Sequence, residues 1–147
     1  MRSLLATAAA CTLLVSCGEV VGNADSQVVK LSTDRATYAV GEAGVLTLEN
    51  LGPHPIGPGN VGGTLLCQPE LQKKTGSEWH VIGRLHEACA LIGLPPLQQS
   101  GSVDKHFDIS PNIWTSGGAY RFRVTVREDI TAQSIDVYSN EFTVIVP

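Results

Sequence analysis

Aromatic side chains are scarce in this chain. Phe, Trp and Tyr make up 5% of its 147 residues, although the hydrophobic fraction is an ordinary 43%. Fifteen glycines and eight prolines accompany this scarcity and suit a fold with many turns. A chain of this length is long enough for one domain and too short for two domains of ordinary size.

A strong net charge is also lacking. The formal charge is -4, and without the first sixteen residues the chain carries 9 basic and 14 acidic residues, or -5. Nucleic acids and anionic membrane surfaces attract proteins with a positive excess. We therefore predict no nucleic-acid partner, and the mild acidity indicates nothing more specific than solubility.

Recognisable catalytic and metal-binding motifs are missing from the sequence. There is no Gly-x-Ser-x-Gly elbow, and the histidines have none of the close spacings of metal motifs. These histidines are His54, His80, His86 and His106. We predict that the protein is not an enzyme and has no cofactor or metal. Metal binding by histidines that meet in space is kept as an alternative.

The N-terminal apolar segment Leu4–Val15 is too short to span a bilayer, which takes roughly twenty residues. It follows Arg2 and ends in Leu14-Val15-Ser16-Cys17, which resembles the lipobox of bacterial lipoproteins. The resemblance implies cleavage before Cys17 and lipid anchoring through it, with the domain facing the periplasm. Gly18 follows where an aspartate would favour the inner membrane, so the outer membrane is favoured.

Three segments follow from this interpretation. Residues 1–16 are a lipoprotein signal peptide, residues 17–27 are the lipidated cysteine with a flexible tether, and residues 28–147 are one domain. Cys67 and Cys89 are then the remaining cysteines, and an oxidising compartment favours a disulfide between them. Such a bond would stabilise the domain by about 3 kcal/mol. A metal site with His80 or His86 is the alternative.

The segment Ser116–Val126 predicts the central strand of a two-sheet sandwich. After a glycine pair, apolar and polar residues alternate without a break, as they do in a strand with one buried face. The inward set is Tyr120, Phe122, Val124 and Val126. The outward set is Arg121, Arg123 and Thr125. These arginines could receive a carboxylate-bearing partner, or pair with acids of the sheet such as Glu49 and Glu141.

About seven strands separated by turn signals predict an all-β antiparallel sandwich. A hairpin is expected around Thr75-Gly76-Ser77, with Trp79 and Val81 on the inner face of its second strand. The other expected strands are 28–32, 44–50, 67–74, 103–109 and 135–146. The last is predicted as one continuous strand.

The two final strands resemble those of bacterial immunoglobulin-like domains. The resemblance rests on Gly-Gly-Ala-Tyr-Arg-Phe-Arg-Val at 117–124 and Ser-Asn-Glu-Phe-Thr-Val at 139–144. Tyr38-Ala-Val-Gly-Glu also fits, so the likeness spans about Val28 to Val146. It implies an immunoglobulin-like β-sandwich with one disulfide and a Tyr120 hydroxyl that bonds the preceding corner. It brings no catalytic residues.

Two unusual loops are the expected place for function, because loops carry binding sites more often than strands do. They are Leu51–Thr64, with three prolines and five glycines, and Gly83–Gly101. The possible binding loop is His54, Pro55 and Ile56. We expect a membrane-anchored, non-enzymatic envelope lipoprotein with a binding or structural role and an unidentified protein partner. The alternatives are a protease inhibitor of the small β-sandwich type and a periplasmic metal-binding protein.

Overall fold

The computed structural model describes residues 29–59, 65–85, 95–128 and 134–146. These ranges contain strands and no helix, so none of them holds a helix that could cross a membrane. The strands are β1 (Val29–Thr33), β2 (Thr37–Ala39), β3 (Ala43–Asn50), β4 (Ile56–Pro58), β5 (Glu70–Thr75), β6 (Glu78–Arg84), β7 (Ser102–Asp108), β8 (Gly118–Glu128), β9 (Ser134–Tyr138) and β10 (Phe142–Ile145).

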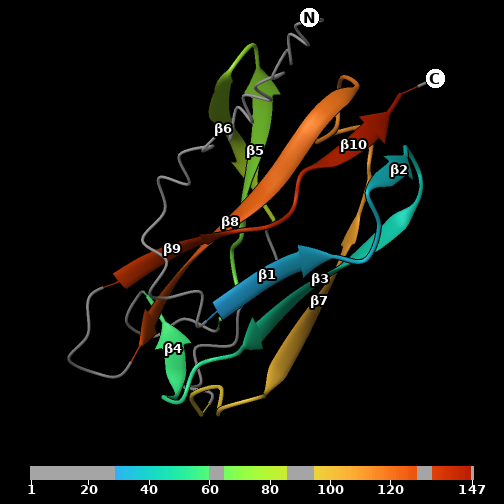
Figure 1. Ribbon diagram of the computed structural model, residues 1–147. Coiled ribbons are helices and arrows are strands. Elements are labelled where there is room, and N and C mark those ends of the chain that lie inside the picture. The colour runs from blue at the N-terminus through green and yellow to red at the C-terminus, as the bar shows by residue number, and fades with distance from the viewer. Residues whose placement is uncertain (1–28, 60–64, 86–94, 129–133, 147) are drawn as a thin grey trace, which may run out of the picture.

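The strands form two sheets (Figure 1). Three of them form a sheet with the order β1-β3-β7. The other seven form a sheet with the order β2-β10-β8-β5-β6, in which β4 and β9 also pair with β8. β2 joins β10 in parallel, and the other pairs are antiparallel. The predicted all-β architecture with two sheets is confirmed, with ten described strands where about seven were expected.

Strand β8 lies at the centre of the larger sheet, as the alternation predicted. Along one edge it pairs with β10 through Gly118–Tyr120 and with β9 through Arg123–Arg127. Along the other edge it pairs with β5 through Tyr120–Arg123 and with β4 through Val126–Glu128. Four neighbours on one strand explain why its inner face is buried along most of its length.

Six of the eight aromatic side chains gather in one buried cluster between the sheets, here named the core aromatic cluster. Its members are Tyr38, Phe107, Trp114, Tyr120, Phe122 and Phe142. Ring centroids of its contacting pairs lie 4.9–6.4 Å apart, in edge-to-face, tilted and stacked arrangements. Such pairs add about 0.5–1.5 kcal/mol each beyond the burial of their area.

Gly44 of β3 lies under this cluster. A Cβ atom there would lie 2.4 Å from Cζ of Phe107 and 2.7 Å from Cε1 of Tyr38, so the rings leave no room for a side chain. The Tyr38 hydroxyl donates a hydrogen bond to the Asp34 carboxylate at 2.7 Å. Burial, together with this bond, raises the pKa of Tyr38 to about 12. The Tyr38 hydroxyl therefore stays protonated and neutral at the pH at which most proteins work.

Two polar contacts hold the aromatic side chains that precede and open β8. The Tyr120 hydroxyl donates to the backbone carbonyl of Ser116, which confirms the expected bond to the preceding corner. The Trp114 indole donates to the carbonyl of Asp108 at 3.1 Å. Trp114 is almost completely buried, although it lies outside any strand and no alternation marked it as a core residue.

The predicted last strand is divided in two, and this prediction was wrong. β9 ends at Tyr138 and β10 begins at Phe142. Between them the Ser139 hydroxyl accepts a hydrogen bond from the amide of Phe122 at 2.9 Å, so a side chain replaces a backbone carbonyl in the ladder. Asn140 then accepts from the amide of Thr33 at 2.8 Å. This bond ties the end of β1 to the larger sheet.

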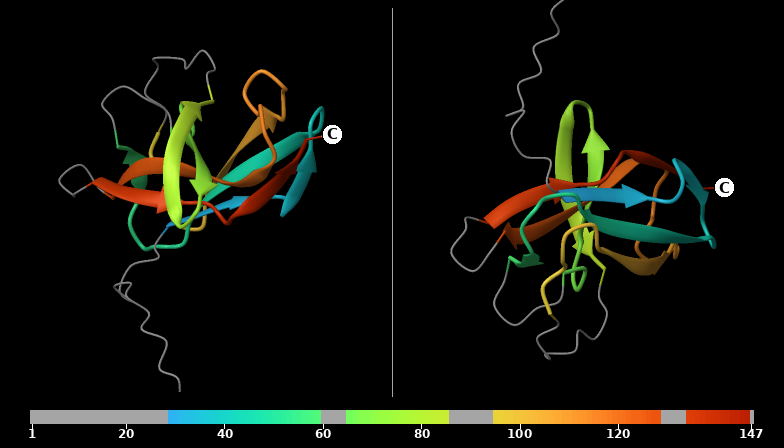
Figure 2. Two further views of the ribbon diagram at one scale, coloured as in Figure 1. Left: turned by 90° about the horizontal axis from the view of Figure 1, so that it is seen from above. Right: turned by 60° about the horizontal axis from the view of Figure 1, so that its bottom comes forward.

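The second strand of the predicted hairpin does not cover the core, so the inward placement of Trp79 and Val81 was wrong. The hairpin of β5 and β6 stands steeply across β9 and β10 and extends beyond the body of the sandwich (Figures 1 and 2). The side chain of Val81 is 54% exposed and that of Ile82 is 44% exposed. An irregularity in the pairing between Leu71 and Gln72 accompanies this exposure.

Candidate binding surface on the larger sheet

The two aromatic residues outside the core lie on either side of one arginine, on the outer face of the larger sheet. The Arg121 guanidinium carbon lies 4.3 Å from the ring centroid of Trp79 and 4.1 Å from that of Tyr138. Its Nε donates to the side-chain oxygen of Gln72 at 2.8 Å. We call Trp79, Arg121 and Tyr138 the arginine clamp. Cation–π contacts of this kind contribute about 0.5–1 kcal/mol each where they are exposed and more where water is excluded.

The hairpin turn positions Trp79 in the clamp. Gly76 has a φ of +62°, a left-handed conformation that favours glycine, and the turn pairs Thr75 with Glu78. Trp79 then lies opposite Lys74, whose Nζ is 5.4 Å from the Trp79 ring centroid. Two cations therefore approach the same indole ring, one from β5 and one from β8.

A row of ion pairs borders the clamp. The Glu70 carboxylate accepts from Arg84 at 2.8 Å and from Nε of Arg123 at 2.8 Å. Arg123 also lies 3.3 Å from Asp136. Burial would raise the pKa of Glu70, but hydrogen bonds from the two arginines outweigh it and hold this pKa below its usual value. The bond to Glu70 in turn raises the pKa of Arg123.

Exposed apolar surface adjoins these charges. Tyr138 is 42% exposed, and Val81 lies on the same hairpin strand as Trp79 with more than half of its surface in solvent. Tryptophan, tyrosine and arginine are the residues that most often dominate binding energy at protein interfaces. The clamp and its surroundings therefore have the composition of an interaction surface.

The sequence pattern revealed half of this surface. The outward direction of Arg121 and Arg123 was predicted, and both side chains are partly exposed. The expected pairing with acids of other strands is confirmed for Arg123, which pairs with Glu70 of β5 and Asp136 of β9. The two acids that were named have other partners: Glu49 pairs with Lys30 and Glu141 with Lys74. The signal for Tyr138 was also present and was missed. In Ser134–Tyr138 the half-buried residues are Ile135 and Val137, so the alternation directs Tyr138 outward.

The predicted binding loop is only partly available to a partner. His54 and Pro55 are exposed, whereas Ile56 is fully buried and exchanges backbone hydrogen bonds with Leu97 at 3.0 and 2.8 Å. Ile56 belongs to β4 and packs in the core, so its assignment to a binding loop was wrong. A short strand can form in this glycine- and proline-rich segment because β8 offers it an open edge.

Asn50 holds the two predicted loops together. Its fully buried side chain donates to the carbonyl of His54 and to that of Leu97, both at 2.9 Å, and accepts from the amide of Gly52 at 3.1 Å. A buried amide with these partners fixes backbone that has no regular structure of its own. The exposed His54–Pro55 segment is therefore attached to backbone that the hydrogen bonds of Asn50 hold in place.

The predicted cysteine chemistry falls largely outside the described residues. Cys67 is disulfide-bonded and lies before β5. Cys11, Cys17 and Cys89 lie outside the described ranges, so the Cys67–Cys89 pairing and the lipidation of Cys17 stay predictions. The signal peptide and the tether lie in the same undescribed N-terminal segment.

The described histidines do not come together. His54, His80 and His106 are exposed, and His86 lies outside the described residues. Within the part of the chain that the structure describes, no three His, Cys, Asp or Glu side chains lie close enough together to hold a metal ion.

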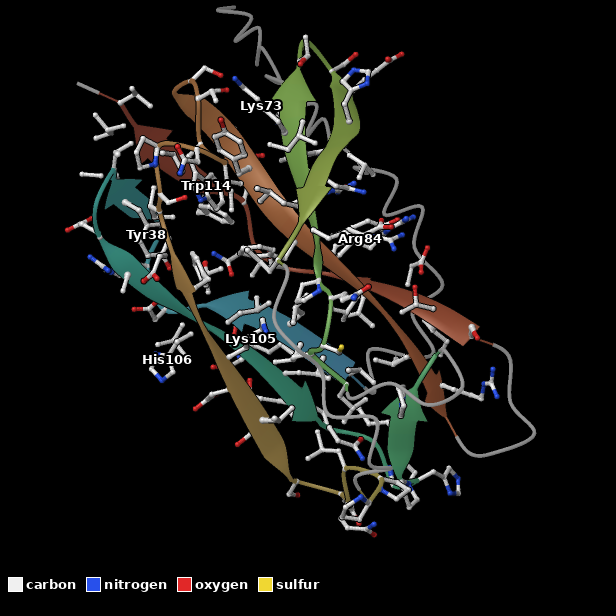
Figure 3. The ribbon with its side chains drawn as sticks, turned by 180° about the vertical axis from the view of Figure 1, so that it is seen from behind. Tyr38, Lys73, Arg84, Lys105, His106 and Trp114 are labelled. Atoms are coloured by element: carbon white, nitrogen blue, oxygen red, sulfur yellow. The ribbon has the colours of Figure 1, made fainter. Side chains whose placement is uncertain are left out.

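A cavity of about 280 Å³ opens beside β7. Its lining includes Leu85, Lys105, His106, Phe107, Asp108, Ser110 and Ile113. Figure 3 shows Lys105 on the inner side of β7 and His106 on its outer side. The polar lining comes from one strand and the turn after it, where successive side chains point to opposite faces. These groups therefore do not converge as a catalytic site requires.

Comparisons with known proteins give only remote likenesses. No family model matches the chain, and no curated protein matches it. Among solved structures, the chain is similar to Pseudomonas fluorescens alkylpurine DNA glycosylase AlkC bound to DNA containing an abasic site analog, with 14% identity and a TM-score of 0.36. It is also similar to β-glucosidase from Listeria innocua in complex with gluconolactone, with 16% identity and a TM-score of 0.30. The matches cover 77% and 78% of this chain but only 30% and 16% of those chains.

Proposed function

We propose that the protein is a lipid-anchored, non-enzymatic binding module of the bacterial cell envelope. Its binding surface is the outer face of the larger sheet, around the arginine clamp. The observation that carries this proposal is the placement of the only two aromatic residues outside the core on either side of Arg121, beside the exposed Val81. Aromatic residues are scarce here, and a folded domain gains most from them in its core.

We assign the domain to the immunoglobulin-like sandwiches. In that fold strands A, B and E share one sheet, and strands C, F and G share the other. The orders β1-β3-β7 and β10-β8-β5 are compatible with this arrangement. The bond from the Tyr120 hydroxyl to the Ser116 carbonyl also supports it. Domains of this kind serve many roles, so the fold supports a binding function without identifying the partner.

The anchor rests on the Leu14–Cys17 motif and is tested by labelling. Cells that express the protein are fed an alkyne analogue of palmitate, and Cys17→Ala is compared with the matched control Cys11→Ala. We expect label and membrane fractionation for the wild type and for Cys11→Ala, and neither for Cys17→Ala. Label that persists in Cys17→Ala would contradict the anchor.

The binding surface is tested by photo-crosslinking in intact cells. A benzoylphenylalanine is placed at Val81, which is 54% exposed, and separately at Lys30, whose side chain is 56% exposed and lies in β1 of the smaller sheet. We expect a discrete protein adduct from position 81 and none from position 30. Equal adducts from both positions, or no adduct from either, would reject this surface.

Protease inhibition is a second candidate, favoured by one observation. An inhibitor presents an exposed loop on a rigid base, and the buried Asn50 amide gives the His54–Pro55 segment such a base. We expect stoichiometric loss of activity of a susceptible envelope protease if this role applies, and relief of that loss in the double variant His54→Ala, Pro55→Ala. If no panel protease is inhibited by the wild type, this candidate fails.

A further inference from the structure

Most charged side chains on the outer face of the larger sheet are matched by opposite charges. The pairs are Lys74–Glu141, Arg84–Glu70, Arg123–Glu70 and Arg123–Asp136. Arg121 differs from its neighbours, because no carboxylate of the described residues lies within ion-pairing distance of it. Two positive charges on this face are therefore left without a close counter-charge from the described chain: Arg121 of the clamp, and Arg127 near the other end of β8, which donates to the Gly59 carbonyl at 3.0 Å.

Arg121 is also held in one orientation. The rings of Trp79 and Tyr138 contact its guanidinium, and Nε is occupied by the hydrogen bond to Gln72, a buried side chain. The two terminal Nη groups donate no hydrogen bond to a described residue. These two groups form the edge of a guanidinium that binds an oxoanion with two parallel hydrogen bonds. Folding has therefore already ordered the Arg121 side chain, so binding an oxoanion costs little further side-chain entropy.

The surroundings favour a carboxylate over a phosphate. Glu141 lies close enough to act electrostatically on Arg121, and Glu70 and Asp136 border the clamp. A dianionic phosphate would be repelled by these acids more strongly than a singly charged carboxylate. The exposed parts of Tyr138 and Val81 offer apolar contact beside the guanidinium, which suits the aliphatic residues that flank an acidic side chain in a protein segment.

We infer that Arg121 is a carboxylate receptor: the clamp binds an aspartate or glutamate side chain of a protein partner, with apolar residues beside it on Val81 and Tyr138. This inference rests on the proposed function of the larger sheet as a binding surface. In it, Arg121 determines the specificity of that surface, and the rings of Trp79 and Tyr138 position Arg121.

The test uses a defined probe. A fluorescent, acetylated and amidated peptide with one glutamate between valines is titrated into the lipid-free domain, and the same peptide with glutamine or phosphoserine in place of glutamate is titrated in parallel. Charge-assisted hydrogen bonds of about 1.5–3 kcal/mol correspond to a loss of roughly tenfold or more. We expect the glutamine peptide to bind at least about tenfold more weakly than the glutamate peptide. Failure of the glutamate peptide to bind at millimolar concentration, or tighter binding of the phosphoserine peptide, would overturn the inference.

Two variants with the same change in net charge locate the effect. Arg121→Gln removes the receptor, and Lys30→Gln removes an exposed cation of the smaller sheet that pairs with Glu49 at 2.7 Å. We expect Arg121→Gln to lose the roughly tenfold preference for glutamate over glutamine, and Lys30→Gln to keep it. If both variants lose this preference equally, the glutamate peptide is bound only by general charge attraction, and the carboxylate receptor is rejected. The comparison of glutamate with glutamine on the wild-type domain decides the matter if Arg121→Gln does not fold.

The same variant separates this inference from the proposed function. Crosslinking at position 81 is repeated in cells that carry Arg121→Gln. Loss of the wild-type adduct supports the receptor. An adduct of unchanged yield leaves the binding surface in place and rejects the role of Arg121, whereas no adduct in the wild type rejects the surface itself.

Discussion

The core aromatic cluster and the arginine clamp use the same kinds of side chain in two different environments. In the cluster, rings contact rings in a space that excludes water, and six members share the contacts. In the clamp, two rings contact one cation, and Tyr138 and Arg121 keep part of their surface in solvent. The cluster therefore contributes mainly to stability. In the clamp the rings are less buried, and they hold a charged group at the surface.

The largest effect is expected inside the cluster. Phe122 is fully buried and contacts the rings of Phe107 and Phe142, with centroid separations of 5.0 and 5.4 Å. Phe122→Ala should lower the free energy of unfolding by about 3–5 kcal/mol, because it removes buried area and leaves a cavity. Urea denaturation measures this loss, and Phe122→Leu is the milder control. A loss below about 1 kcal/mol would mean that the cluster is not the main source of stability.

The ion pairs beside the clamp should depend on pH. Glu70 has a pKa below its usual 4.5 in the folded state, so its contribution is present above that value and is lost as the pH falls through the folded pKa. At pH 7, Glu70→Gln should destabilise the domain by about 1–2 kcal/mol, given two partly exposed arginine partners. Chemical denaturation at pH 7 and near pH 3 should show the difference from the wild type shrinking at the lower pH. A difference independent of pH would contradict the ionic contribution.

The polar contact at the corner before β8 should contribute less. Tyr120→Phe keeps the ring in the cluster and removes only the hydrogen bond to the Ser116 carbonyl. The expected loss is about 1 kcal/mol, the ordinary net contribution of one such bond. Thermal and urea unfolding measure it, with Tyr138→Phe as a control for loss of a hydroxyl outside the core. A loss as large as that of Phe122→Ala would show that the corner, rather than ring packing, organises the cluster.

The smallest loss of stability is expected from the clamp. Trp79 lies on a hairpin beyond the sandwich, so Trp79→Ala should cost about 0.5–1 kcal/mol, the contribution of an exposed cation–π contact. Urea denaturation provides the value. A loss of 3 kcal/mol or more, as in a core position, would remove the distinction between the two aromatic groups.

The sequence predicted the parts of the fold in which side-chain alternation is unbroken. All four inward residues of β8 are buried, and the hairpin turn at Gly76 lies where glycine and serine marked it. The same rule failed at Trp79, because alternation reports two faces and does not say whether a second layer covers either of them. The steep angle of the hairpin decides that point, and side-chain alternation does not encode this angle.

Contacts between distant segments were harder to predict. Trp114 reaches the core from an irregular segment, and Ser139 interrupts a strand by placing a hydroxyl in the ladder. Neither event changes the local pattern of apolar and polar residues. The clamp was half predicted for the same reason: the outward direction of Arg121 is a local property, whereas its two ring partners come from β6 and β9.

The closeness of Gly44 to the rings of Phe107 and Tyr38 has an evolutionary consequence. A side chain at position 44 needs smaller partners at 38 and 107, and larger partners require glycine. In any collection of diverged relatives the three positions should therefore change together or not at all. Drift at position 44 is restricted by Tyr38, a near neighbour in the chain, and by Phe107, which lies far from it, and this restriction should outlast any change of binding partner at the surface.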